Sequence, residues 1–111
     1  MAKIRTAFGV SGILQCIRPE RNPDGAPLAV TAVSASSANP IGSEAIAFYA
    51  TTDVHVYFSV NAVDAATVND YIVPSGTERV LHCQENDYLH ARRTATSADG
   101  TLSWWPAAIV I

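Results

Sequence analysis

The feature that most constrains the fold is a strict alternation of apolar and polar residues between Asp53 and Val60. Successive side chains of a β-strand point to opposite faces, so the pattern predicts a strand with one face on a core. The core face would carry Val54, Val56, Phe58 and Val60, and the other face Asp53, His55, Tyr57 and Ser59. That second face is expected to meet water or a partner.

Turn-forming residues recur at short and even intervals along the rest of the chain. Gly allows positive φ, Pro fixes φ, and Asn and Asp close turns with their own side chains. Such residues gather at 11–12, 23–25, 39–42, 74–76, 85–87 and 98–100. The segments between them are short and rich in Val, Ile, Thr, Tyr and Phe. This pattern predicts an all-β fold, an antiparallel β-sandwich with jelly-roll-like topology.

Further strands are expected in the segments that these turns separate. They cover residues 28–33, 45–50, 69–73, 76–83 and 87–94, and the last two flank a tight turn that predicts an antiparallel hairpin. The apolar segment 102–111 is interrupted by Pro106, which lacks the N–H that a sheet ladder needs. We therefore expect an edge strand there, or two short strands that meet at a bend. Helix is expected at most as one turn at 63–68.

The length of 111 residues suits a single domain over residues 1–111, with room for a modest core. Residues 1–27 have a poorer strand pattern, and we expect them to form an extended arm or a loosely packed segment. No long apolar run follows the basic residues near Met1, and no stretch approaches the ~18–20 apolar residues of a membrane span. Neither a signal peptide nor a membrane partner is expected.

The net charge and the small number of charged residues limit the classes of partner that the chain is expected to bind. The net charge is −3 and the densest basic point is Arg92-Arg93, which disfavours binding to nucleic acid and to membrane surfaces. Only 15% of the residues are charged, against an average near ~25% for soluble domains. Such a weakly charged surface is either covered by a partner or simply rich in Ser, Thr, Asn and Ala.

The three histidines are candidate metal ligands. His82 and His90 flank the predicted hairpin turn and would pair across two strands, with Glu78 on the same face as His82. A zinc site needs a third and usually a fourth ligand, and Cys83 points away from His82. We expect no metal site, and interpret His55, His82 and His90 as surface or interface residues.

Catalytic motifs are not found in the sequence. It has no Gly-x-Ser-x-Gly elbow and no Gly-x-Gly-x-x-Gly loop, and most carboxylates sit at turns or strand ends, where Asp serves turn chemistry. We expect no catalytic residue, no cofactor and no enzymatic activity. Cys16 and Cys83 are expected to be buried free thiols, with a disulfide as the alternative.

The adjacent pair Trp104-Trp105 is the most informative candidate for binding. In a strand one ring enters the core and the other faces out, and an exposed Trp often marks a partner surface or a sugar platform. The alternative is a strand covered on both faces, with both rings buried. Exposed tyrosines would extend such a surface, so a carbohydrate-binding module is the alternative function. The candidate tyrosines are Tyr49, Tyr57, Tyr71 and Tyr88.

Three segments carry a resemblance to a known family. They are Ala47–Ser59, Asp70–Glu78 with its Pro-Ser-Gly-Thr turn, and Asn86–Arg92 with its Asn-Asp-Tyr start. This succession over roughly residues 45–95 resembles the small capsid decoration proteins, called staple or cement proteins, of short-tailed bacteriophages. A small tail or head-completion protein would share the same strand pattern.

The resemblance implies a structural virion protein, made in the bacterial host cytoplasm and located on the outer capsid surface. It would bind the phage major capsid protein, stabilise the shell, and often associate as a dimer. The family supplies no sharp motif, so the interface residues are inferred from this sequence, including an arm that adds a strand to a neighbour's sheet. They are Ile4, Arg5, Phe8, His55, Tyr57, Trp104 and Trp105.

Overall fold

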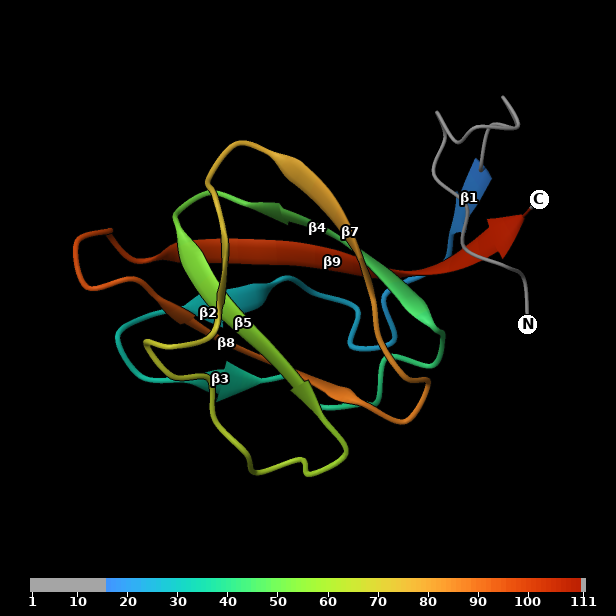
Figure 1. Cartoon of the computed structure of the whole chain (residues 1–111), viewed down its shortest axis with the longest axis horizontal. Helices are drawn as coiled ribbons and strands as arrows, with labels where there is room; N and C mark the ends of the chain where they lie inside the picture. The colour runs from blue at the N-terminus through green and yellow to red at the C-terminus, as the bar shows by residue number, and fades with distance from the viewer. Residues whose placement is uncertain (1–15, 111) are drawn as a thin grey trace.

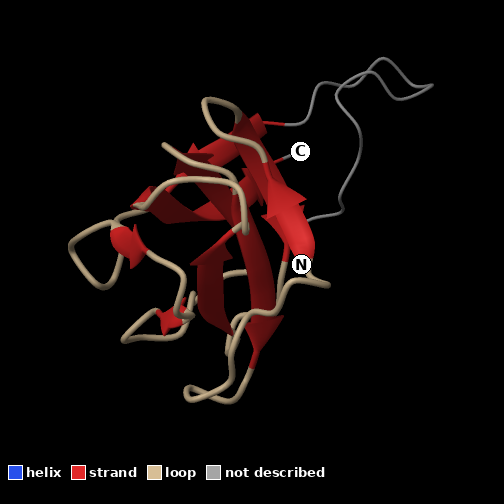
Figure 2. Cartoon of the chain, turned by 90° about the vertical axis from the view of Figure 1, so that its left-hand side faces the viewer, coloured by secondary structure: helices blue, strands red, loops and turns tan. Residues whose placement is uncertain are grey.

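A computed structural model describes residues 16–110, which form β-strands joined by loops and turns (Figure 2). Within this range there is no helix, not even the single turn expected at 63–68, and so no helix that is long and apolar enough to cross a membrane. The strands are β1 (Cys16–Pro19), β2 (Leu28–Val30), β3 (Ala35–Ser36), β4 (Ala45–Ala50), β5 (Val54–Ser59), β6 (Tyr71–Val73), β7 (Glu78–His82), β8 (Tyr88–Arg93) and β9 (Gly100–Val110).

The strands form two antiparallel sheets that pack as a sandwich (Figure 1). Sheet A has the order β1-β9-β4-β7, with β2 also paired to β9, and sheet B has the order β3-β8-β5-β6. The pairs are nested: β5 with β6 is innermost, followed by β4 with β7, β3 with β8, and β2 with β9. A long ribbon of nested pairs rolled into two sheets is a jelly roll, so the predicted fold class is confirmed.

The core lies between the inner faces of the two sheets. Phe48 of β4 and Phe58 of β5 stack across the gap with ring centroids 6.0 Å apart and planes 9° from parallel. Val54 and Val56 enter the same core, as the alternation predicts. Val60 does not, because β5 ends at Ser59 and Val60 lies exposed in the loop that follows.

The prediction for the C-terminal segment is wrong. β9 is one continuous strand of 11 residues and lies inside sheet A, with β4 on one side and β1 and β2 on the other. Pro106 is tolerated because its carbonyl accepts a hydrogen bond from the Glu20 N–H at 2.8 Å, on the side away from β4. Backbone N–H and C=O of one strand residue point the same way, so the missing N–H removes no bond to β4.

The predicted hairpin of residues 76–83 and 87–94 is also wrong. β7 pairs with β4 in sheet A, whereas β8 pairs with β5 and β3 in sheet B. The turn between them is tight, as Asp87 accepts a hydrogen bond from the Gln84 N–H at 2.9 Å, but it carries the chain from one sheet to the other. A turn signal therefore located the change of direction without specifying the pairing partner.

Residues 1–27 were expected to form an extended arm or a loosely packed segment, and of these the structure describes residues 16–27, which lie along β9, with residues 18–27 mostly exposed. β1 pairs with the end of β9 (Figure 1), and the Asn22 amide donates to the Trp104 carbonyl at 3.0 Å. The loop of residues 20–27 thereby runs beside β9 between β1 and β2. Residues 1–15, which include the interface candidates Ile4, Arg5 and Phe8, lie outside the described residues.

Neighbouring residues on β4 provide a test of the sandwich. Phe48 is fully buried and Tyr49 is 43% exposed on the outer face. We expect Phe48→Ala to lower the free energy of unfolding by about 3–5 kcal/mol, because it leaves a cavity between the sheets. Tyr49→Ala should cost less than about 1 kcal/mol. Urea unfolding measures both variants, and equal losses would contradict the assigned faces.

Candidate functional site

The described residues hold no cluster suited to metal binding. No group of three or more His, Cys, Asp and Glu side chains among residues 16–110 is placed to hold a metal ion. Cys83 is a buried free thiol whose Sγ contacts the Ser43 carbonyl at 3.2 Å. Burial, followed by the charges of Asp87 and Glu44, raises the pKa of this thiol to about 12. It stays protonated at neutral pH and is a poor nucleophile.

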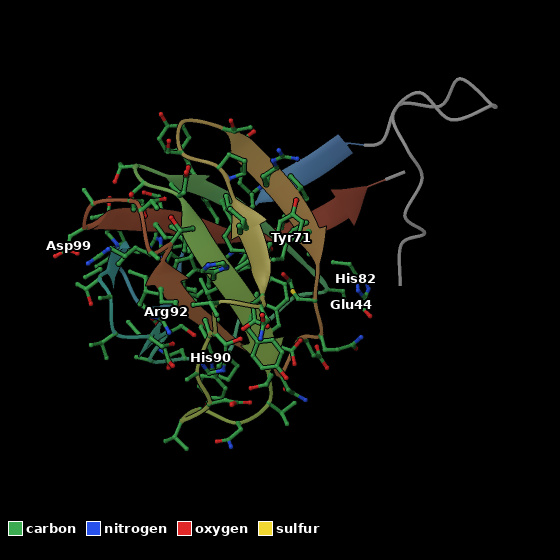
Figure 3. All side chains as sticks on the ribbon, turned by 60° about the vertical axis from the view of Figure 1, so that its left-hand side comes forward. Glu44, Tyr71, His82, His90, Arg92 and Asp99 are labelled. Atoms are coloured by element: carbon green, nitrogen blue, oxygen red, sulfur yellow. The ribbon has the colours of Figure 1, made fainter. Side chains whose placement is uncertain are left out.

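The three histidines occupy separate places. His82 is exposed on β7 of sheet A, and His55 and His90 lie on strands of sheet B. Figure 3 shows His82 and His90 well apart, so the predicted cross-strand pair does not form. His55 was expected at a partner surface, but it is buried, with Nδ1 at 2.9 Å from the Asp70 carbonyl.

His90 lies between two serines on the outer side of sheet B and is fully buried. Its Nδ1 is 2.6 Å from Ser36 Oγ and its Nε2 is 3.0 Å from Ser59 Oγ. The same hydroxyl groups face the carbonyls of Asp64 and Asn61, at 3.4 Å and 3.3 Å. A neutral imidazole has one N–H, so one of the two hydroxyl groups donates to the ring.

These contacts hold the loop of residues 60–70 across the outer face of sheet B. The loop leaves β5 and reaches over to the β3 edge, where the Ala66 N–H donates to Ser34 Oγ at 2.9 Å. It then returns to β6 past His55. The loop is therefore attached to the sheet at both sides, through Ser34 and Ser36 on one side and His55 on the other.

Several exposed apolar side chains stand on this loop and on the strands beside it. Val63 is 87% exposed, so its side chain contributes nothing to the core. We call the group the loop surface; it consists of Tyr57, Val60, Val63, Val68 and Ile72. Concentrations of exposed apolar residues mark interaction sites more often than isolated ones do.

A second apolar surface lies on the outer face of sheet A. Trp105 is half-buried there, and its register places it beside Ala47 and then Val80 in one row across β9, β4 and β7. Tyr49 stands in the next row and is 43% exposed. We call this group the Trp105 surface; it consists of Tyr49, Val80 and Trp105 over Ala45, Ala47 and Ala107.

A shallow groove of about 330 Å³ borders Trp105. The loop of residues 20–27 forms one wall and β9 the floor; the lining residues are Asn22, Gly25, Ala26, Pro27, Ser103, Trp104 and Trp105. The Asn22 amide is already bonded to the carbonyls of Ala26 and Trp104. The groove is thus a recess beside an aromatic ring, and the Asn22 amide in its wall is already hydrogen-bonded within the chain.

The predicted interface residues are distributed over the two faces of the sandwich. Tyr57 belongs to the loop surface on sheet B, and Trp105 to the surface on sheet A. Trp104 is in the core and only 2% exposed, so its expected partner contact is corrected: β9 alternates, and its neighbour takes the outer position. The two exposed candidates therefore form separate sites that face away from each other.

Two surface residues, Val63 and Val68, escaped the sequence interpretation because they carry no strand pattern and stand among Asn and Asp in a segment that resembles an ordinary loop. The alternation assigns Val60 to the core face of the preceding strand, but it lies exposed in this loop. The available signal was valine inside a run of turn formers, where polar residues are usual.

Comparison of the chain with protein-family models, curated proteins and solved structures finds no match.

The buried His90 predicts a dependence of stability on pH. Burial lowers the pKa of His90, and the charges of Asp64 and Asp87 oppose that effect only in part. The unfolded chain then binds a proton more readily, since an unperturbed His has a pKa near ~6.5. The contribution of neutral His90 to the free energy of unfolding is therefore present in full above about pH 6.5, and it falls as the pH decreases below that value.

We expect His90→Gln to reduce this loss, because its amide keeps a donor and an acceptor for the two serines but does not titrate. Urea unfolding between pH 7.5 and pH 5 measures the slope for both proteins. His55 and His82 are present in both, so the difference isolates His90. Identical slopes would show that His90 does not govern the acid response.

Proposed function

We propose that the chain is a structural protein that binds neighbouring subunits of a phage capsid and ties them together on the outer surface of the virion. The observation that carries this proposal is the presence of two apolar surfaces on opposite outer faces of one sandwich. The capsid as partner rests on the resemblance of residues 45–95 to phage decoration proteins. The role includes no catalysis and no cofactor.

Two opposed surfaces suit a bridging role for a physical reason. A protein with one contact site decorates a subunit, whereas a protein with two sites links two subunits. Once one site is bound, the second acts at a high effective concentration, so weak contacts add up to a firm attachment. The rigid core between the sheets keeps the distance and direction of the two sites constant.

The composition of the surfaces supports burial against protein. Trp105 and Tyr49 offer large rings on sheet A, and Val63 and Tyr57 offer apolar side chains on sheet B. Aromatic residues are enriched and charged residues depleted at the centres of protein interfaces. Apolar burial contributes roughly 25 cal/mol per Å² before the costs of association are subtracted.

Shell binding tests the proposal. Added to expanded shells that lack the chain, the wild type should bind and raise the shell's melting temperature. Trp105→Ala and Val63→Asp should each weaken binding, by about 2 kcal/mol for a central Trp anchor. Each should also abolish the rise in melting temperature, because one surface alone attaches without bridging.

Calorimetry and sedimentation of loaded shells measure both effects. Thr96→Ala, at an exposed position in neither surface, is the matched control and should behave as wild type. Wild-type bridging by both surface variants would refute the two-site role. No binding of the wild type to any shell would refute the capsid as partner.

Carbohydrate binding is the second candidate, and the groove beside Trp105 favours it. Jelly rolls include lectin domains, and a recess next to an aromatic ring suits a sugar. If this candidate is right, NMR titration with oligosaccharides should shift the signals of Ser103, Trp105 and Asn22, and Trp105→Ala should remove the shifts. A panel of glycans that leaves these signals unchanged would dismiss it.

A further inference from the structure

Strand β7 forms an open edge of sheet A. It pairs with β4 on one side, and no strand within residues 16–110 pairs with its other side. The Cys83 N–H donates to the Glu44 carbonyl at 3.0 Å, which sets the direction of the backbone groups along the strand. Residues in step with Cys83, such as Arg79, direct their N–H and C=O groups to β4. The groups that face the open edge are therefore those of Glu78, Val80 and His82.

A charged side chain stands on the inner face of this edge strand. Arg79 lies opposite Phe48 of β4 in register, so its side chain enters the margin of the core. Its Nε is buried without a hydrogen-bond partner, and no carboxylate among residues 16–110 forms an ion pair with its guanidinium. A buried donor that lacks an acceptor costs free energy. The open edge therefore has a donor on its inner side that this part of the chain leaves unsatisfied.

A strand added to the edge would bring an acceptor to that donor. In antiparallel pairing Val80 forms a hydrogen-bonded pair with one residue of the added strand, and Arg79 faces the next residue in a non-hydrogen-bonded pair. Side chains of such pairs are the closer ones, and this residue also points to the inner face. A Glu or Asp there can accept from Nε and one Nη together, in the forked geometry of arginine–carboxylate pairs.

The chain itself offers no strand that supplies this carboxylate. Residues 1–15 contain no Asp and no Glu. A second β7 that used its own open backbone groups would keep its one acid, Glu78, on the outer face in every register. An inward charge at an edge opposes pairing with strands of this kind. Arg79 therefore disfavours strands of this chain at the β7 edge and favours a strand with an acid at one position.

We infer that β7 accepts an extended strand of another protein, and that this strand carries a Glu or Asp opposite Arg79. The residue opposite Leu81 is apolar, because Leu81 packs against the core. The residue opposite Val80 is apolar too, because Val80 is 44% exposed on the outer face. Backbone hydrogen bonds give such a complex its affinity and the side-chain pairs give it specificity. The inference goes beyond the proposed function and does not rest on it.

NMR titration of the isotope-labelled whole chain tests the inference. The probe is the end-blocked peptide Thr-Thr-Val-Val-Glu-Lys-Thr, whose central Val meets Val80 and whose Glu meets Arg79 in antiparallel register. It should shift the backbone amide signals of Glu78, Val80 and His82. The same peptide with Gln in place of Glu should bind at least about tenfold more weakly, because its side chain carries no charge for the guanidinium.

Three variants locate the preference for the acid. Arg79→Met should bind the Glu and Gln peptides equally, because no guanidinium is left to distinguish them. Arg92→Met is the matched control and should keep the preference: its Nε is also buried without a partner, but it lies on β8 of the other sheet, well apart from His82 in Figure 3. Val80→Pro removes an N–H that faces only the open edge, so it should weaken the binding of both peptides.

Circular dichroism verifies that the variants are folded, and Arg79→Gln serves if Arg79→Met is not. A wild type whose β7 amides do not shift at any peptide concentration would overturn the inference, whether the edge stays open or is already covered. Equal affinity of the wild type for the two peptides would overturn it too. Shell binding is a separate measurement, so a failure here and a failure of the proposed function are distinguishable.

Discussion

The burial of alternating side chains between two sheets is the constraint on which the whole molecule depends. Phe48 and Phe58 stack across that gap, and Trp104 lies next to Phe48 in register on β9. Every strand that contributes to the core must place one face inward, and this leaves its second face free for other uses. The outer faces of sheets A and B are therefore where this protein can hold sites that differ from its core.

The two outer faces are used differently. On sheet A the apolar side chains stand on the strands themselves, with Ala47 between Trp105 and Val80 in one row. On sheet B the strands carry polar residues that are buried under a loop, with His90 held by Ser36 and Ser59. The apolar side chains there belong mainly to the loop. One face offers a flat, rigid site and the other a site whose position depends on buried polar contacts.

This difference affects how the chain would link two neighbouring capsid subunits under the proposed function. Contacts on a sheet are fixed by the ladder of backbone hydrogen bonds and lose little entropy when a partner binds. Contacts on a loop adapt more easily to a partner's shape, because only a few bonds attach the loop to the sheet. A protein with one site of each kind can hold a constant position on one subunit and accommodate variation in its neighbour.

Local pattern in the sequence determined most of the strands, though not β1 and β3, and the inner face of the strand from Val54 to Phe58. The strand at 45–50 has the predicted bounds, and the alternation from Val54 to Phe58 assigns the inner face correctly. Side-chain direction has a period of two residues, so it is readable from neighbouring residues alone. The same rule separated Trp104 from Trp105, although it left open which ring was buried.

Tertiary structure decided which strands pair and what covers each outer face. Pro106 suggested an edge strand, yet β9 is central, because the neighbouring chain needs only the Pro106 carbonyl at that point. The turn at 85–87 suggested a hairpin but joins two sheets. His55 had the pattern of an exposed residue until the loop of residues 60–70 covered it. Pairing and coverage depend on contacts between residues far apart in the chain, and no local pattern carries that information.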